Sequence, residues 1–245
     1  MSHEHHGHSH SHGHGHSHGH GHSHGAGEGK TGDGAVDYAE QNANFNSEEY
    51  ARMTETVPEW QAMVDAQRAF VAAQEWWSAE SSKTYKTLDF GCGTGRLLCG
   101  MGARLGAGSV GLDPAAGMLT VAREHAVEDG LTSVVTFDSI DPAKDGAELD
   151  SFADSFDLVL NVLVLHHLSK PKAIVERLIK ALAPGGRIFI VERADGFSLD
   201  QLKSLFAAAG IEVTAEMTRD FDIPPFNGNP ATTMTAYHVL GQKAI

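Results

Sequence analysis

The pattern of hydrophobic and polar positions divides the chain into three stretches. Residues 1–34 alternate His, Gly and Ser and contain no hydrophobic run, whereas residues 37–80 carry apolar side chains at helical spacing. From residue 86 onward, short apolar runs alternate with amphipathic segments, which is typical of a parallel sheet covered by helices on both faces. We therefore predict a disordered tail over 1–34, a helical segment over 35–84 and an α/β domain over 85–245.

The periodicity also predicts the individual elements of the α/β domain. Strands are expected at 85–90, 109–112, 134–137, within 157–168, and at 187–191, 211–218 and 233–240. Helices are expected at 96–105, 114–130, 171–182 and 199–209. Between the last two strands, 221–229 reads as an irregular loop.

The helical segment has two interpretations. Pro58 suits the first turn of a helix, and an aromatic and aliphatic stripe follows it at helical spacing: Trp60, Met63, Val64, Phe70, Val71 and Trp77. Such a stripe favours core packing, and the alternative is a lid over a binding site. Tyr38, Phe45 and Tyr50 lie on the less regular part and are the better candidates to face a substrate.

A glycine-rich turn stands between the first predicted strand and the helix after it. Residues 88–95 read Leu-Asp-Phe-Gly-Cys-Gly-Thr-Gly. A dinucleotide fingerprint, G-x-G-x-x-G, would need glycine where Arg96 stands, so the spacing here is G-x-G-x-G. With the acid Asp89 two residues ahead, this string resembles motif I of the class I S-adenosylmethionine-dependent methyltransferases.

The resemblance continues at three further places. Gly-Leu-Asp-Pro over 111–114 matches the family's pattern after motif I, Pro-Gly-Gly over 184–186 precedes a hydrophobic strand, and Leu-His-His-Leu over 165–168 leaves the fourth strand. The segment 149–156 is similar to the quinone-biosynthesis type, although Asp150 stands where that type has Pro. The family's fold is a doubly wound, mostly parallel sheet of seven strands closed by an antiparallel hairpin, with a helical lid.

The resemblance implies a set of cofactor-binding residues. Asp113 would accept hydrogen bonds from ribose hydroxyls, Asp138 would meet the adenine amino group, and Asn161 would border the transferred methyl group. Asp113 and Asp138 also have plainer interpretations, as a helix cap and as a turn residue. The whole set is Asp89, Gly91, Cys92, Gly93, Gly95, Asp113, Pro114, Asp138, Ser139 and Asn161.

The two histidines after the fourth strand are the candidates for catalysis. His166 or His167 could act as general base for a phenolic or acidic hydroxyl, because imidazole titrates near neutrality. The alternative is that both pack and hydrogen-bond at a helix start. Asn161 is followed by Val162 and Leu163, which does not match the Asn/Asp-Pro-Pro-aromatic string of enzymes that methylate adenine N6.

Charge and cysteine content limit the partners and the compartment. The formal net charge is −14, so the surface would repel a phosphate backbone, and a nucleic-acid substrate is disfavoured. Cys92 and Cys99, the only cysteines, read as free thiols of a reducing, cytoplasmic compartment. No apolar run is long enough for a membrane span.

The tail offers a separate chemistry. Its twelve histidines on a flexible chain could chelate Zn or Ni, with His3, His5, His6, His8, His10 and His12 as the first candidates. The alternative is a solubilising tail with incidental metal affinity. The sequence thus predicts an S-adenosylmethionine-dependent methyltransferase of a small-molecule acceptor. The alternatives are a protein methyltransferase, or a metal-binding protein on a non-catalytic scaffold that binds the cofactor.

Overall fold

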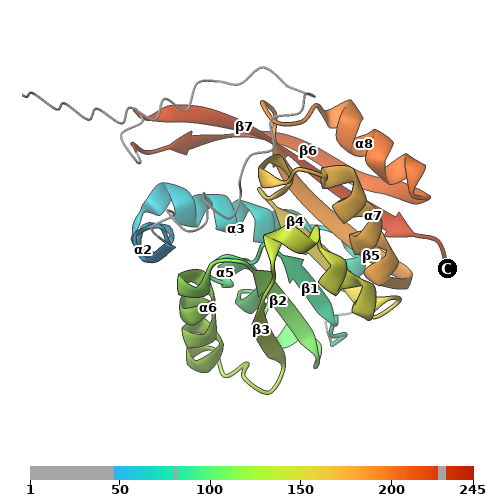
Figure 1. Cartoon of the computed structure of the whole chain (residues 1–245), viewed down its shortest axis with the longest axis horizontal. Helices are drawn as coiled ribbons and strands as arrows, with labels where there is room; N and C mark the ends of the chain where they lie inside the picture. The colour runs from blue at the N-terminus through green and yellow to red at the C-terminus, as the bar shows by residue number, and fades with distance from the viewer. Residues whose placement is uncertain (1–46, 80–81, 226–229) are drawn as a thin grey trace, which may run out of the picture. The chain divides into compact units, whose positions relative to one another are not determined.

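The computed structural model describes residues 47–79, 82–225 and 230–245. Its centre is a seven-stranded sheet in the order β3-β2-β1-β4-β5-β7-β6 (Figure 1). The strands are β1 Thr87–Phe90, β2 Ser109–Asp113, β3 Val135–Ser139, β4 Phe156–Val162, β5 Leu182–Arg193, β6 Ile211–Ile223 and β7 Thr232–Lys243.

The strand directions confirm the predicted topology. The strands β3, β2, β1, β4 and β5 pair in parallel, whereas β7 is antiparallel to both β5 and β6. The carboxyl ends of the parallel strands therefore meet at one edge, and the order turns outward in both directions from β1 and β4. Ligands of open α/β sheets bind at such a switch point.

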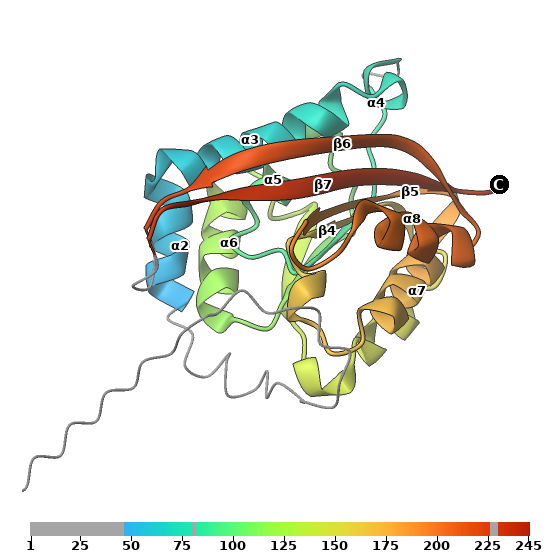
Figure 2. The same cartoon turned by 90° about the horizontal axis from the view of Figure 1, so that it is seen from above.

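Helices cover both faces of the sheet. They are α2 Ser47–Thr56, α3 Pro58–Ala72, α4 Glu75–Ala79, α5 Arg96–Cys99, α6 Ala116–Glu128, α7 Pro171–Ala181 and α8 Leu199–Ala208. Short 3₁₀ turns are η1 Gly102–Arg104, η2 Pro142–Lys144, η3 Ala147–Phe152 and η4 Leu165–His167. The helices α3, α5 and α6 pack on one face, and α7 and α8 pack on the other (Figure 2).

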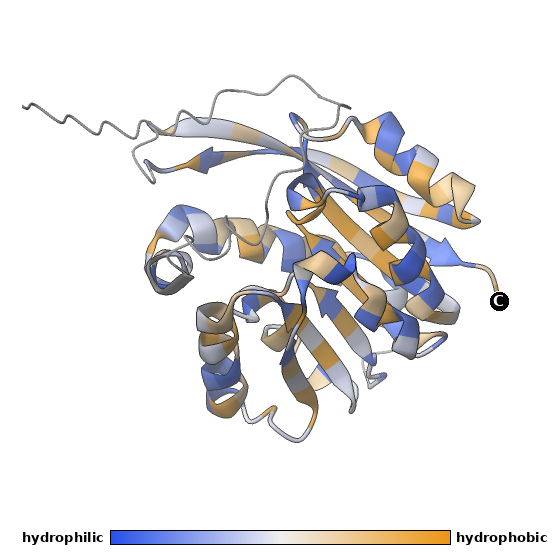
Figure 3. Ribbon diagram, viewed as in Figure 1, coloured by the Kyte–Doolittle hydropathy of each residue, from blue (hydrophilic) through white to orange (hydrophobic). Residues whose placement is uncertain are grey.

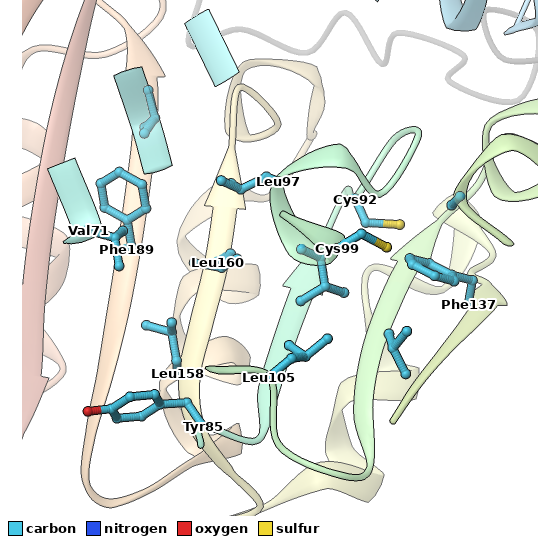
Figure 4. Packing of buried hydrophobic residues seen from close by; sticks show 14 of the residues in the cluster. Val71, Tyr85, Cys92, Leu97, Cys99, Leu105, Phe137, Leu158, Leu160 and Phe189 are labelled. Carbon is cyan, nitrogen blue, oxygen red and sulfur yellow. The ribbon is translucent and has the colours of Figure 1, made fainter. Parts of the chain in front are cut away.

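Two hydrophobic clusters fill the space between sheet and helices. The central strands are the most hydrophobic part of the ribbon (Figure 3) because parallel strands covered on both faces bury both sets of side chains. On the α3 face, Phe70 stacks on Phe189 with ring centroids 5.3 Å apart, and Leu97, Cys99 and Phe137 continue the packing (Figure 4). This confirms the core-packing interpretation of the aromatic stripe.

Several predicted boundaries are wrong. The helix predicted over 96–105 ends at Cys99, since Gly102 has φ +52° and the chain tightens into a 3₁₀ turn. The helix predicted from Pro114 begins at Ala116, because Ala115 is extended at φ −90° and ψ 108°. The strands β5 and β6 are longer than predicted, so part of the loop expected over 221–229 is strand and residues 226–229 lie outside the described chain.

None of the helices in the described part of the chain combines the length and apolar character needed to cross a bilayer.

Candidate active site

The glycine turn follows β1 and gives its three glycines different surroundings. Gly91, Gly93 and Gly95 all have positive φ, at +80°, +54° and +68°. A Cβ on Gly91 would lie 2.2 Å from a Val164 methyl, and one on Gly95 would lie 2.9 Å from the Phe137 ring. A Cβ on Gly93 would have no heavy atom within 4 Å. The first and third glycines therefore fit the turn against the protein, and the second faces open space.

Asp113 braces this turn from the end of the neighbouring strand β2. Its Oδ2 accepts a hydrogen bond from the Gly93 N–H at 2.9 Å, and its Oδ1 accepts one from the Ala115 N–H at 2.9 Å. A carboxylate has about four acceptor positions, so two remain for another donor. Burial raises the pKa of Asp113, and the two backbone hydrogen bonds act in the opposite direction.

The groups beneath the turn are strongly buried. Burial, and secondly the charge of Asp113, raises the pKa of Asp89 to about 8. Burial likewise raises the pKa of the Cys92 thiol well above its ordinary value and that of Cys99 to about 12. Both thiols are free and remain protonated near neutral pH, so neither is prepared to act as a nucleophile.

Asp138 and Ser139 lie on β3 at the same edge of the sheet. The register pairs Asp138 with Leu112 and Ser139 with Asp113, and both side chains are exposed. Pro114 is half-buried just before α6. All three are therefore beside the turn of Gly93 and Asp113.

Asn161 lies inside β4 and is fully buried, and its side chain links β4 to the end of β1. Its Nδ2 donates to the Phe90 carbonyl at 3.1 Å, next to the start of the glycine turn. Its Oδ1 is buried without a hydrogen-bond partner among the described residues. Leu163, just beyond the strand, has the strained φ of +57°.

A histidine and a buried glutamate form a pair where β4 and β5 end. Glu192, on β5, has no exposed surface; its Oε1 lies 2.5 Å from Nδ1 of His166, and its Oε2 accepts the His166 backbone N–H at 3.1 Å. A carboxylate at Nδ1 selects the tautomer protonated there, leaving Nε2 with a lone pair. Nε2 has no hydrogen-bond partner in the described part of the chain. This arrangement orients a general base.

His167 does not share the carboxylate. Its ring centroid is 3.9 Å from that of His166, and its side chain is the more exposed of the two. Partial burial, and secondly the charge of His166, lowers the pKa of His167 to about 4. His167 is therefore neutral near pH 7. Its ring has no hydrogen-bond partner among the described residues that would orient it.

Comparisons with known proteins agree with this geometry. Residues 88–190 match the family described as "Methyltransferase domain". The matched residues are similar to a methyltransferase domain. A ubiquinone biosynthesis O-methyltransferase from Chelativorans sp. is 39% identical over 114 residues, which is 46% of this chain and 42% of that protein. The chain thus matches less than half the length of this curated relative.

Solved structures establish the fold of the domain. Magnesium protoporphyrin IX methyltransferase from Synechocystis, determined with bound S-adenosylmethionine, has a TM-score of 0.55 at 16% identity and covers 87% of each chain. The [4+2]-cyclase SpnF has a TM-score of 0.57 at 17% identity, covering 76% of this chain and 83% of that one. The α/β domain therefore has the class I methyltransferase fold, as predicted.

Helix α2 brings residues to the domain that the sequence pattern missed. Glu55 binds Arg96, the residue after Gly95, through a bidentate contact, and also lies 3.1 Å from Nε2 of His125. Tyr50 lies within electrostatic reach of Asp113: burial around its hydroxyl, then the Asp113 charge, raises the Tyr50 pKa to about 12. Only Tyr50, among the three predicted substrate-facing aromatics, is described; Tyr38 and Phe45 lie outside the described residues.

The missed residues carry no local signal. Glu55 is one of several acidic residues in α2, and Glu192 lies near the end of the hydrophobic strand β5. Neither stands in a recognisable motif, so only the fold reveals their partners. The tail histidines lie outside the described residues. Within the described ranges, no group of three or more His, Cys, Asp or Glu side chains could hold a metal ion.

The turn fits the cofactor that the domain match supports, S-adenosylmethionine. Open space above Gly93 allows close backbone approach, and Asp113 keeps acceptor positions for hydroxyl donors. The unpartnered Asn161 Oδ1 adds a buried acceptor at the adjacent strand end.

Proposed function

We propose that the protein is an S-adenosylmethionine-dependent methyltransferase that methylates a hydroxyl group of a small-molecule acceptor. The observation that carries the proposal is the position of the oriented His166–Glu192 pair on the same edge of the sheet as the glycine turn. The O-methyltransferase relative supports the hydroxyl, and a phenolic or quinone-like acceptor is the nearest analogy. We do not assign that relative's substrate to this protein, because the match covers 42% of the relative's length.

The residues of the chain take distinct parts in this reaction. The cofactor, when bound, supplies an electrophilic methyl group on a sulfonium centre. The glycine turn and Asp113 position it, with Asp138 and Ser139 on the adenine side. His166 receives the acceptor's hydroxyl proton at Nε2, and Glu192 stabilises the imidazolium that results. Holding both reactants in line contributes about 7 kcal/mol or more to lowering the barrier.

The other functions considered from the sequence are less well supported. A protein methyltransferase and a metal-binding protein on an inactive scaffold receive no support from the O-methyltransferase relative. The cyclase SpnF shares the fold, so the fold alone does not define the reaction. The division into a lid over 35–84 and a cofactor domain over 85–245 stays a prediction, as does the cytoplasmic location.

An acceptor screen tests the proposal. The full-length protein is incubated with S-adenosylmethionine and panels of phenols, catechols, hydroquinones, carboxylic acids and amines, and S-adenosylhomocysteine formation is measured. We expect turnover within the hydroxyl panels, with one methyl gained on oxygen by mass spectrometry. Turnover confined to amines, or none in a protein that binds the cofactor, would contradict an O-methyltransferase.

Cofactor affinity is expected to rise with pH because of Asp89. With its pKa raised to about 8, this carboxyl is protonated in the cofactor-free protein at neutral pH. S-adenosylmethionine is a net cation, so its binding favours the carboxylate and releases a proton. Affinity should therefore increase by up to roughly tenfold per pH unit below that pKa and level off above it. Asp89→Asn should remove this pH dependence of the affinity. Calorimetry in buffers of different ionisation enthalpy measures the proton release, and equal binding heats for the wild type in all buffers would contradict the prediction.

Binding of Zn or Ni by the tail also stays a prediction. Deleting residues 2–34 removes all twelve clustered histidines and should abolish most Zn or Ni uptake while leaving cofactor affinity unchanged. Isothermal titration of both proteins measures the two affinities. A loss of cofactor affinity on deletion would place the tail within the active site.

A further inference from the structure

Helix α2 buries few of its side chains against the α/β domain. Among its described side chains, residues 50–56, only Ala51 is fully buried. A hollow of about 500 Å³ lies along the seam with α6, lined by Arg52, Val121 and Glu124 among others. A segment with few buried contacts opens at low free-energy cost, so polar contacts decide where α2 lies.

Those polar contacts converge on Glu55. Its carboxylate accepts from Arg96 Nε at 3.1 Å and from Nη2 at 2.5 Å, a bidentate geometry. Its Oε2 also lies 3.1 Å from Nε2 of His125 on α6. The three side chains are mostly buried, with 23% of Glu55, 29% of Arg96 and 17% of His125 exposed. Screening by solvent is therefore weaker than at a surface ion pair.

The same cluster reaches the glycine turn. Arg96 directly follows Gly95, and Nδ1 of His125 lies 2.8 Å from the Thr94 carbonyl. Both ring nitrogens of His125 thus face oxygen atoms, the Thr94 carbonyl at Nδ1 and the Glu55 carboxylate at Nε2. Burial alone would raise the pKa of Glu55, but Arg96 and His125 outweigh it and hold that pKa below its ordinary value. The carboxylate is thus charged and fully engaged.

One turn of helix before Glu55, α2 carries Tyr50 toward Asp113. The hollow between α2 and α6 is lined by Ala51, the neighbour of Tyr50, and by Gly117, four residues after Asp113, so this end of α2 lies near the end of β2. Tyr50 packs edge-on against Trp60 with ring centroids 5.7 Å apart, and burial, then the Asp113 charge, raises its pKa to about 12. We propose that Glu55 is a positioning residue that fastens α2 to the glycine turn through Arg96 and His125, and thereby holds Tyr50 over the ribose side of the cofactor site. Cofactor entry and release then require this clamp to open.

This inference rests on the proposed cofactor site, and its test separates the two. The rate of S-adenosylhomocysteine dissociation is measured by stopped-flow fluorescence for the wild type, Glu55→Gln and a control. Glu55→Gln keeps the size of the side chain but loses its charge, and we expect dissociation to be roughly tenfold faster. The control is Glu216→Gln on β6, which removes an exposed ion pair with Lys203 of α8 and should leave the dissociation rate unchanged.

Two further measurements exclude a general loss of structure. Amide exchange in the cofactor-free protein should increase over residues 47–56 in Glu55→Gln and stay unchanged in the sheet. In a Tyr50→Ala background, Glu55→Gln should change dissociation by less than about twofold, because Glu55 acts through Tyr50.

The outcomes are distinct. If the wild type does not bind S-adenosylhomocysteine, the proposed function fails. If the wild type binds it and Glu55→Gln releases it at the wild-type rate, or if the two substitutions act additively, the clamp is overturned and the proposed function stands.

Discussion

Replacing His166 with glutamine is expected to lower kcat for a hydroxyl acceptor by about 10²- to 10⁴-fold. Glutamine cannot take up a proton, whereas His166 presents Nε2 with its other nitrogen held 2.5 Å from Glu192. Affinity for S-adenosylhomocysteine should stay within about twofold, since the glycine turn and Asp113 are untouched. Single-turnover kinetics with the acceptor found by screening, beside calorimetry, separates the two effects.

His167→Gln is the matched control for this prediction. His167 is the neighbour of His166 in the chain and has the same side chain, but it has no carboxylate as a hydrogen-bond partner. Its replacement should therefore lower kcat by less than about threefold. Glu192→Gln should give an intermediate loss of kcat, because the imidazolium formed in the reaction loses its counter-charge. Equal losses from His166→Gln and His167→Gln would contradict the assignment of the base.

Gly93→Ala is expected to weaken cofactor binding by roughly 10- to 100-fold, since the added methyl fills the space in which backbone and ligand approach each other. The cost to folding should be only about 1 kcal/mol, from the positive φ of +54°, because the new Cβ meets no protein atom within 4 Å. Calorimetry measures the affinity and thermal unfolding measures the stability.

The chain offers a close control for this substitution. Gly130, after α6, also has a positive φ, at +68°, and a Cβ there also meets nothing within 4 Å. Gly130→Ala should therefore cost similar stability and leave cofactor affinity unchanged. Gly91→Ala should behave differently again and destabilise the fold, because its Cβ would overlap Val164. A cofactor affinity unaffected by Gly93→Ala would remove the glycine turn from the binding site.

The sequence was sufficient for the parts of the site that are local in the chain. The glycine turn, Asp113 at the end of the next strand and the histidines after β4 each stand in a short string with its own spacing. Strand alternation then placed them on one edge, because parallel strands share the direction of their carboxyl ends. The antiparallel β6 and β7 followed from the same pattern and the family resemblance.

The rest depended on contacts between distant segments. Glu192 approaches His166 only because β4 and β5 pair in register, and Glu55 meets Arg96 across 41 residues. The Asn161 amide ties β4 to the carbonyl of Phe90, a contact between distant segments, and its place beside the methyl group stays a prediction. Helix boundaries at Cys99 and Ala116 depended on backbone angles that neighbouring hydrogen bonds impose. None of these features has a signature in residue spacing.

Whether the glycine turn binds S-adenosylmethionine can be measured in one calorimetric titration. The metal-free full-length protein is titrated calorimetrically with S-adenosylmethionine and S-adenosylhomocysteine, with Gly93→Ala and Gly130→Ala alongside. We expect micromolar, one-to-one binding of both ligands to the wild type and to Gly130→Ala, and weakened binding to Gly93→Ala. Absence of binding to the wild type, or equal binding to all three proteins, would contradict it.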